Sequence, residues 1–131
     1  MSAPTAPKKI LVVDDDKAVI TLLESLLSSQ GYKVSAANDG LDAMVQVRNN
    51  VPDLIILDIM MPELNGYDVC SNLKFDERFK HIPIIVLTSR EQELTSGISQ
   101  LMGIGYMQKP IDSKILLEKI QNILKISPNE K

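Results

Sequence analysis

The sequence predicts an α/β fold, a doubly wound parallel sheet of five strands written (βα)₅, and two observations lead to this class. Four short apolar runs are continuous rather than alternating, which is typical of strands buried on both faces of a parallel sheet. The segments between these runs carry apolar residues at helical spacing. Because strand and helix alternate along the chain, the order favours a parallel sheet with helices on both faces.

Five segments are predicted as strands. Three of them are rich in isoleucine, valine and leucine, and polar breaks bound each run. The run KVSAA is weaker, and the last strand is short. In chain order the predicted strands cover residues 10–13, 33–37, 54–57, 84–87 and 104–108.

The predicted helices follow the 3.6-residue repeat. The first contains Val19–Leu27, with Asp16 expected to begin or cap it and Gly31 placed where a C-terminal cap is needed. The last contains Leu116–Leu124, with Asp112 as its expected N-cap. Three further helical segments are predicted at residues 40–47, 66–73 and 94–102.

The 131 residues predict one domain, which is long enough to bury a core of its own. Residues 1–8 are expected to form a loose N-terminal tail, because prolines alternate there with small side chains, and residues 127–131 a similar C-terminal tail. The folded domain is therefore expected over residues 9–126. No output domain is expected, since only about five residues follow the last predicted helix.

Charge and composition exclude several classes of function. A formal net charge of −3 leaves no overall basic field, so neither nucleic acid nor a membrane is an expected partner. No apolar run is long enough to span a bilayer and no signal-peptide core is found, which favours a cytoplasmic location. A single cysteine, Cys70, excludes an internal disulfide, and with a single histidine it cannot form a usual zinc site. Any metal must then be a hard cation on oxygen ligands.

Polar side chains follow four of the predicted strands at the point where each strand ends. Because the carboxyl ends of parallel strands share one edge of the sheet, where open α/β folds bind ligands, these side chains are expected to converge. They are Asp14, Asp15 and Asp16 after the first strand, Asp58 after the third, Thr88 and Ser89 after the fourth, and Lys109 after the fifth.

This set of side chains indicates phosphoryl chemistry. Clustered carboxylates suit Mg²⁺, which takes one or two carboxylates, several waters and phosphate oxygens. A carboxylate can also act as a nucleophile and form an acyl phosphate. A lysine and a divalent ion neutralise the charge that develops on a transferring phosphoryl group. The site is therefore expected to accept a phosphoryl group.

Four stretches of the sequence carry a resemblance to a known family. They are ILVVDDD, LIILDIMMPELNG, VLTS and YMQKP, within a similarity that covers roughly Lys9 to Leu124. The chain resembles the receiver domain of a two-component response regulator, of the single-domain type. The resemblance implies a flavodoxin-like fold with strand order 2-1-3-4-5, as in chemotaxis receivers, and a signalling module that turns over no external substrate.

The resemblance also implies roles for the acidic residues. Asp58 is similar to the aspartate that becomes phosphorylated. Asp15 resembles the acid that ligates Mg²⁺ directly, while Asp14 is expected to act mainly through a metal-bound water. The backbone carbonyl of Met60 corresponds to a further metal ligand, and Asp58 completes the ligand set.

Other residues are implied to respond to the phosphoryl group. Thr88 resembles the hydroxyl that moves toward it, Ser89 offers a backbone N–H to its oxygens, and Lys109 pairs with it. Tyr106 resembles the switch aromatic that turns inward when Thr88 shifts. Pro110 implies a cis Lys109–Pro110 bond, which an X-Pro peptide accepts at modest cost.

Two features leave the rates and the partner surface open. The positions that tune rates in the family correspond to Met60 and Arg90, although a free surface cation is an equal expectation for Arg90. Before the switch tyrosine, the segment Gly103–Tyr106 is one residue shorter than the family pattern. This difference affects the loop before the last strand and the surface that faces partners, and it does not touch the acidic residues.

The expected partners follow from the same resemblance. A phosphohistidine on a histidine kinase or a histidine phosphotransfer protein is expected to donate the phosphoryl group to Asp58. A downstream protein is expected to bind the face formed by the fourth helix (94–102), the fifth strand (104–108) and the fifth helix (116–124). The expected function is that of a stand-alone receiver that switches protein–protein interactions in two-component signal transduction.

Two alternatives use the same side chains. An aspartyl-phosphate hydrolase on a related fold carries a second acid two residues after its nucleophile, where this chain has Met60. Asp14 and Asp16 do have D-x-D spacing, but no segment is long enough to enclose a substrate. A receiver-like scaffold that is never phosphorylated usually lacks the acid pair, the aspartate or the lysine, and all of these are present here.

Overall fold

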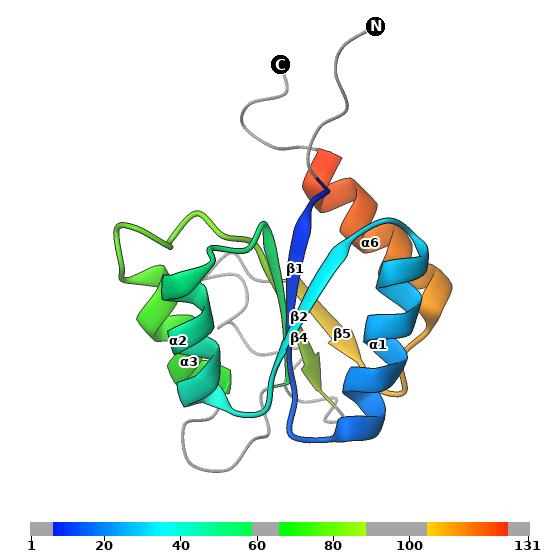
Figure 1. The fold of residues 1–131 in the computed structure, drawn as a ribbon, viewed down its shortest axis with the longest axis horizontal. Coiled ribbons are helices and arrows are strands. Elements are labelled where there is room, and N and C mark those ends of the chain that lie inside the picture. The colour runs from blue at the N-terminus through cyan, green and yellow to red at the C-terminus, as the bar shows by residue number, and fades with distance from the viewer. Residues whose placement is uncertain (1–6, 59–65, 89–104, 126–131) are drawn as a thin grey trace, which may run out of the picture.

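The computed structural model describes residues 7–58, 66–88 and 105–125, which form a sheet with helices on both sides (Figure 1). The strands are β1 (Lys9–Val13), β2 (Lys33–Ala37), β3 (Leu54–Asp58), β4 (Ile84–Thr88) and β5 (Gly105–Gln108). The helices are α1 (Lys17–Ser29), α2 (Gly40–Asn49), α3 (Gly66–Lys74) and α6 (Ser113–Lys125). The helix predicted over residues 94–102 lies outside the described residues.

Every neighbouring pair of strands in the sheet is parallel. The spatial order is β2-β1-β3-β4-β5, which confirms the predicted fold class and the strand order that the resemblance implies. From β1 the chain first adds β2 on one side and then β3 on the other, so the strand order reverses between β1 and β3. The carboxyl ends of these two strands therefore flank the crevice where open α/β folds bind ligands.

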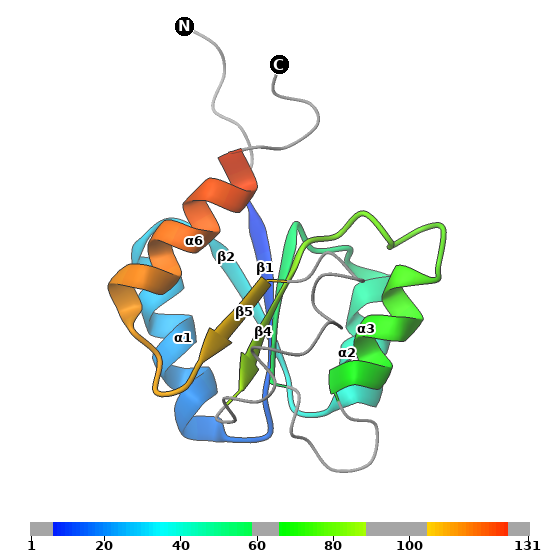
Figure 2. The same cartoon turned by 180° about the vertical axis from the view of Figure 1, so that it is seen from behind.

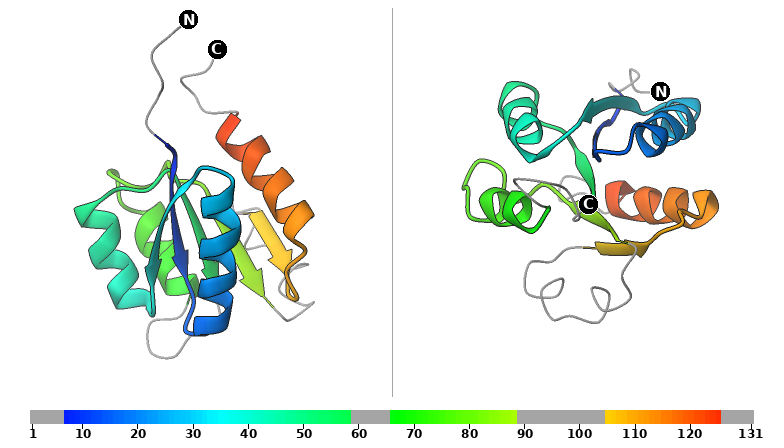
Figure 3. Two further views of the ribbon diagram at one scale, coloured as in Figure 1. Left: turned by 45° about the vertical axis from the view of Figure 1, so that its right-hand side comes forward. Right: turned by 90° about the horizontal axis from the view of Figure 1, so that it is seen from below.

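The sheet is the middle one of three layers. Helices α1 and α6 cover one face and α2 and α3 the other (Figures 1 and 2), and the view from below shows the layers end on (Figure 3). Alternate residues of β1 enter the two cores, Ile10 and Val12 on the α1–α6 side and Leu11 and Val13 on the α2–α3 side. Because both faces are covered, the strand is a continuous apolar run rather than an alternating one.

Local hydrogen bonds fix both ends of α1 as predicted. The Asp16 carboxylate accepts a hydrogen bond from the Ala18 N–H at 2.9 Å, which makes Asp16 the N-cap. After the helix, Gly31 has a φ of 92°, which glycine adopts without the strain that a side chain would cause. Its N–H donates to the Ser28 carbonyl at 3.0 Å, so the chain turns out of the helix toward β2.

Helix α6 also begins as predicted. The Asp112 carboxylate accepts from the Ile115 N–H at 3.1 Å, and Leu116 and Ile120 are buried against the sheet. The described helices extend a residue or a few beyond the predicted bounds, because a helix includes terminal residues that do not belong to its apolar stripe. Among the helices that the structure describes, none combines the length and the apolar character needed to cross a bilayer.

Candidate functional site

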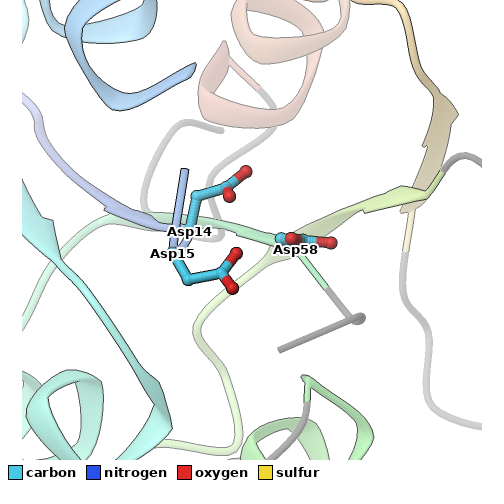
Figure 4. A group of neighbouring side chains, drawn as sticks. All are labelled: Asp14, Asp15 and Asp58. Carbon is cyan, nitrogen blue, oxygen red and sulfur yellow. The ribbon is translucent and has the colours of Figure 1, made fainter. Parts of the chain in front are cut away.

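The ends of β1 and β3 bring the predicted acids together. Val13 pairs with Leu57 in the parallel ladder, so Asp14 and Asp58 follow at the same level of the sheet. Asp15 is the next residue after Asp14, and its side chain lies beside the other two (Figure 4). One carboxylate oxygen from each of these three residues lies within 4.8 Å of the others. The sheet topology therefore assembles a carboxylate cluster from two segments that are distant in sequence.

The three carboxylates differ in burial. Asp14 and Asp58 are buried, and the Asp14 side chain is only 1% exposed, whereas Asp15 faces solvent. A buried carboxylate is stable only with hydrogen bonds or a counter-ion. Asp14 has both of these.

Lys109 supplies the counter-ion. It follows β5 directly, and its backbone N–H donates to the Thr88 carbonyl at 2.7 Å. Its Nζ donates to Asp14 Oδ2 at 3.2 Å and lies 3.6 Å from Asp58 Oδ2. The ammonium group thus contacts two of the three acids, one from each strand.

The backbone also holds Asp14. The Asp16 N–H donates to Asp14 Oδ1 at 2.9 Å, and the Asp14 N–H donates to the Ala37 carbonyl at the end of β2. Burial raises the pKa of Asp14; the Asp16 N–H and Lys109 oppose this effect, the charge of Asp58 adds to it, and the net shift is upward. The ionised form of Asp14 is therefore disfavoured in spite of its hydrogen bonds.

Lys109 remains charged in this environment. Burial by itself lowers the pKa of its ammonium group, but the Asp14 and Asp58 carboxylates outweigh burial, and the net shift is upward. One ammonium group faces three carboxylates, so the cluster carries surplus negative charge when all three are ionised. A bound cation would remove this surplus.

The donor set fits a hard divalent cation. Among the residues that the structure describes, the cluster offers carboxylate oxygens and neither histidine nor sulfur ligands. Mg²⁺ prefers oxygen ligands, uses few carboxylates and keeps several waters. The exposed position of Asp15 leaves the cluster accessible to such waters. Asp14, Asp15 and Asp58 are therefore suited to hold Mg²⁺.

Thr88 lies at the same edge of the sheet. It is the last residue of β4 and is buried. Leu87 pairs with Asp58 across the ladder, so Thr88 extends one residue beyond the level of Asp58 on the adjacent strand. The Lys109–Pro110 peptide bond after β5 is cis, as predicted. Thr88 thus ends β4 and Lys109 directly follows β5, and these two strands lie on the far side of β3 from β1.

Other predicted site residues are not placed. Met60, Ser89 and Arg90 lie outside the described residues, as do the first two residues of the shortened segment Gly103–Tyr106. The backbone of Tyr106 belongs to β5, where it pairs with Val86. Its inward turn stays a prediction.

Two contacts of the site are absent from the sequence predictions. Lys109 is predicted to serve the phosphoryl group on Asp58, whereas its shorter contact is with Asp14. Asp16 is predicted only as a helix start, whereas its N–H also orients Asp14. The contact between Lys109 and Asp14 has no sequence signature, because it depends on how the turn after β1 faces the end of β5. The contact between Asp16 and Asp14 is a local one that aspartate side chains favour, so the acidic run after β1 could have indicated it.

The fold and the site together define a class of signalling domain. The family model described as the response regulator receiver domain matches residues 10–121, so the chain belongs to that family. Receiver domains work with histidine kinases in two-component signalling, and they are signalling modules rather than conventional enzymes. This membership agrees with an acidic pocket next to a lysine.

Two curated relatives illustrate the range of proteins that carry this domain. The response regulator PleD of Caulobacter vibrioides is 39% identical over 121 residues, which cover 88% of this chain and 26% of PleD. Protein PilG of Pseudomonas aeruginosa is 35% identical over 114 residues, which cover 86% of this chain and 84% of PilG. The chain thus spans about a quarter of the length of PleD and most of PilG.

Solved structures show the same fold. The chemotaxis protein CheY4 of Vibrio cholerae aligns with a TM-score of 0.83 and 28% identity, over 90% of this chain and 99% of that one. The receiver domain of a sensor histidine kinase from Pseudomonas aeruginosa aligns with a TM-score of 0.80 and 29% identity, over 91% and 98%. That second structure has a magnesium ion coordinated in its active-site cleft.

Proposed function

We propose that this chain is a response-regulator receiver whose Asp58 accepts a phosphoryl group from a partner phosphohistidine in the presence of Mg²⁺. The observation that carries the proposal is the arrangement around the Asp58 carboxylate. The partly buried ammonium group of Lys109 lies 3.6 Å from one of its oxygens, and carboxylate oxygens of Asp14 and Asp15 lie within 4.8 Å. Positive charge and a cation site thus flank the proposed nucleophile.

The metal ligands in this proposal come from two strand ends. Asp15 and Asp58 would bind Mg²⁺ through carboxylate oxygens, Asp14 mainly through a metal-bound water, and Met60 through its backbone carbonyl. When bound, Mg²⁺ supplies charge neutralisation for the phosphoryl oxygens and orients them. The surplus negative charge of the described cluster supports this assignment.

The transfer step needs only groups that the proposal names. A carboxylate oxygen of Asp58 attacks phosphorus, the P–N bond to the partner histidine breaks, and the electron pair stays on the imidazole nitrogen. Lys109 pairs with a phosphoryl oxygen, which it can reach because its Nζ already lies near Asp58. Later, water attacks phosphorus, the P–O bond to Asp58 breaks, and inorganic phosphate leaves, which returns Asp58 to a carboxylate. Met60 and Arg90 are proposed to tune these rates.

The phosphoryl group then acts as a switch in this proposal. The Thr88 hydroxyl moves toward it, the Ser89 N–H binds one of its oxygens, and Tyr106 turns inward as Thr88 shifts. To change the population from mostly inactive to mostly active, the phosphoryl group must favour the active form by about 5 kcal/mol. Several charge-assisted hydrogen bonds are enough for this difference.

A downstream protein is proposed to bind the face that includes β5 and α6. A groove of about 540 Å³ runs beside these elements, with Gly105 at the start of β5 on one side and Ile115, Lys119 and Asn122 of α6 on the other. Its mixed apolar and polar lining supports recognition of a protein segment. Neither nucleic acid nor a membrane is a proposed partner.

We also propose that residues 9–126 form one receiver domain, which acts in the cytoplasm. The match to PilG supports this reading because it covers most of both chains. The match to PleD shows that related receivers also occur within much longer proteins.

The proposal is tested by adding a small phosphodonor to the purified protein with and without Mg²⁺ and measuring its mass. We expect one phosphoryl adduct that requires Mg²⁺ and is absent in Asp58→Asn, because the amide lacks the nucleophilic oxygen. Asp76→Asn is a matched control, since Asp76 pairs with Arg78 outside the carboxylate cluster, and it should keep the adduct. A wild-type protein that never gains the adduct would instead support the scaffold alternative.

A further inference from the structure

Asp16 is the third acid of the run that begins at Asp14, and it is not part of the carboxylate cluster. We propose that Asp16 is a positioning residue for the Mg²⁺ site. By capping α1, its side chain fixes the backbone N–H that orients the Asp14 carboxylate. The inference rests on the function proposed above and extends it to a residue outside the ligand set.

Three hydrogen bonds hold Asp16 in place. Its carboxylate accepts from the Ala18 N–H at 2.9 Å, and its carbonyl accepts from the Ile20 N–H at 3.1 Å. Its own N–H donates to Asp14 Oδ1 at 2.9 Å. With φ −95° and ψ 110° the residue is extended, so its N–H lies outside the helical hydrogen-bond ladder and is available to Asp14.

Asp14 depends on this N–H when Lys109 changes partner. In the described contacts, Asp16 holds Oδ1 and Lys109 holds Oδ2. The proposed function moves Lys109 toward the phosphoryl group, and its bond to Asp14 then weakens. The bond from Asp16 does not involve Lys109, so it continues to orient Asp14 throughout the phosphorylation cycle.

The side chain of Asp16 secures the position of that N–H. Residues without a side-chain acceptor hold the N-cap conformation poorly, so an alanine there would let the turn after β1 change its dihedral angles. Contacts that orient a metal-binding residue typically change metal affinity by 10–100-fold when removed. Because Asp16 acts through one backbone bond, we expect a loss of about tenfold.

The experiment is a calorimetric titration of the full chain with Mg²⁺. Asp16→Ala should weaken Mg²⁺ binding about tenfold, while Asp16→Asn and Asp16→Ser should remain within about twofold of the wild type, since both are good N-caps without charge. Ser25→Gly is the matched control, because Ser25 is exposed in the middle of α1 and glycine weakens the helix there. This control should keep the wild-type affinity.

A second measurement needs no metal. Amide hydrogen exchange at residue 16, followed by NMR, should be slow in the wild type, Asp16→Asn and Ser25→Gly, because the N–H is bound to Asp14. It should become several-fold faster in Asp16→Ala. A general loss of stability would also accelerate exchange in Ser25→Gly, so the comparison separates positioning from helix stability.

The Mg²⁺ affinities of the variants separate a role of the Asp16 cap from a role of its charge. If Asp16→Asn and Asp16→Ser lose affinity as strongly as Asp16→Ala, the charge of Asp16 matters rather than its cap, and the inference is wrong. It is also wrong if Asp16→Ala binds Mg²⁺ like the wild type while Asp58 is still phosphorylated, and the proposed function then stands. A wild-type protein that neither binds Mg²⁺ nor gains a phosphoryl group rejects both.

Discussion

At the scale of single residues, the site is a balance of charge and burial. Asp14 and Asp58 are buried, and Lys109 compensates only part of their charge, so the pKa of Asp14 is raised by burial and by Asp58 against the pull of Asp16 and Lys109. A divalent cation bound beside these residues would neutralise the remaining negative charge. The cluster of buried carboxylates therefore carries a local cost in stability when no cation is bound.

Burial has the same effect at Cys70, which belongs to α3 and packs in the core between that helix and the sheet. Burial raises the pKa of its thiol from 9.0 to about 12, with Lys74 opposing the shift. The unfolded chain ionises this thiol near its ordinary pKa while the folded chain keeps it neutral. The stability due to the neutral thiol is thus fully present at neutral pH and is lost as pH rises from about 9 to 12.

We expect Cys70 to resist thiol reagents in the native protein at pH 8, because the thiolate is the reactive form and neither it nor solvent access is available. Labelling with a chromogenic disulfide should become complete in concentrated urea. Fast labelling of the native protein at pH 8 would show that the α3 side of the core opens readily, contrary to the packing described here.

At the scale of elements, the edge strand β2 depends on α2. The Lys33 N–H and the Ala37 carbonyl form hydrogen bonds with the residues that flank β1. Because backbone groups alternate in direction along a strand, those of Val34 and Ala36 point to the free edge of the sheet. Gln46 of α2 donates from Nε2 to the Ala36 carbonyl at 2.6 Å. The helix thereby supplies a donor to one of the outward carbonyls, which could otherwise form a hydrogen bond with a strand of another molecule.

Gln46→Ala should lower the free energy of unfolding by about 1–2 kcal/mol, because it leaves the partly buried Ala36 carbonyl without this donor. Urea unfolding followed by circular dichroism measures the change. Asn49→Ala, at an exposed position of the same helix, should alter stability by no more than about 0.5 kcal/mol. Equal effects of the two substitutions would mean that the bond to β2 contributes nothing measurable.

At the scale of the whole molecule, the sheet order determines where charge accumulates. The strand order reverses at β1 and β3, and both of these central strands end in acids, so folding itself creates the carboxylate cluster. In the unfolded chain Asp58 is separated from Asp14 and Asp15, and water solvates all three carboxylates. A cation that binds the cluster therefore binds the folded state preferentially and stabilises it.

Mg²⁺ should raise the melting temperature. At a concentration ten times its Kd, mass action adds about 1.4 kcal/mol to the stability, which corresponds to roughly 3–6 °C for a domain of this size. Differential scanning fluorimetry across a millimolar titration measures the shift. Flat melting temperatures would contradict the assignment of the cluster as a Mg²⁺ site.

Asp14→Asn provides the control for this titration. The environment of Asp14 disfavours its charged form, so the neutral amide should melt higher than the wild type without Mg²⁺ and should gain less when Mg²⁺ is added. A variant that melts lower without metal and keeps the full Mg²⁺ response would show that burial and the charge of Asp58 do not destabilise the Asp14 carboxylate.

Much of the fold could be predicted because it depends on local patterns. Continuous apolar runs located the strands, and Asp16, Gly31 and Asp112 located helix ends through hydrogen bonds within a few residues of each. The convergence of Asp14, Asp15 and Asp58 was also predictable, since parallel strands share one carboxyl edge. The roles of Met60, Ser89, Arg90 and Tyr106 rest on the resemblance and stay predictions.

By itself, therefore, the sequence determined the class of fold, the edge that carries the site and the acids that gather there, because period and strand direction are local properties of the chain. Only the tertiary structure decided which partners these acids take. Lys109 and Asp14 are 95 residues apart, and their 3.2 Å contact depends on the register of four strands and on the turn between β1 and Asp16. The distance between two such side chains is set by how the strands and helices pack together, and no single segment of the sequence determines that packing.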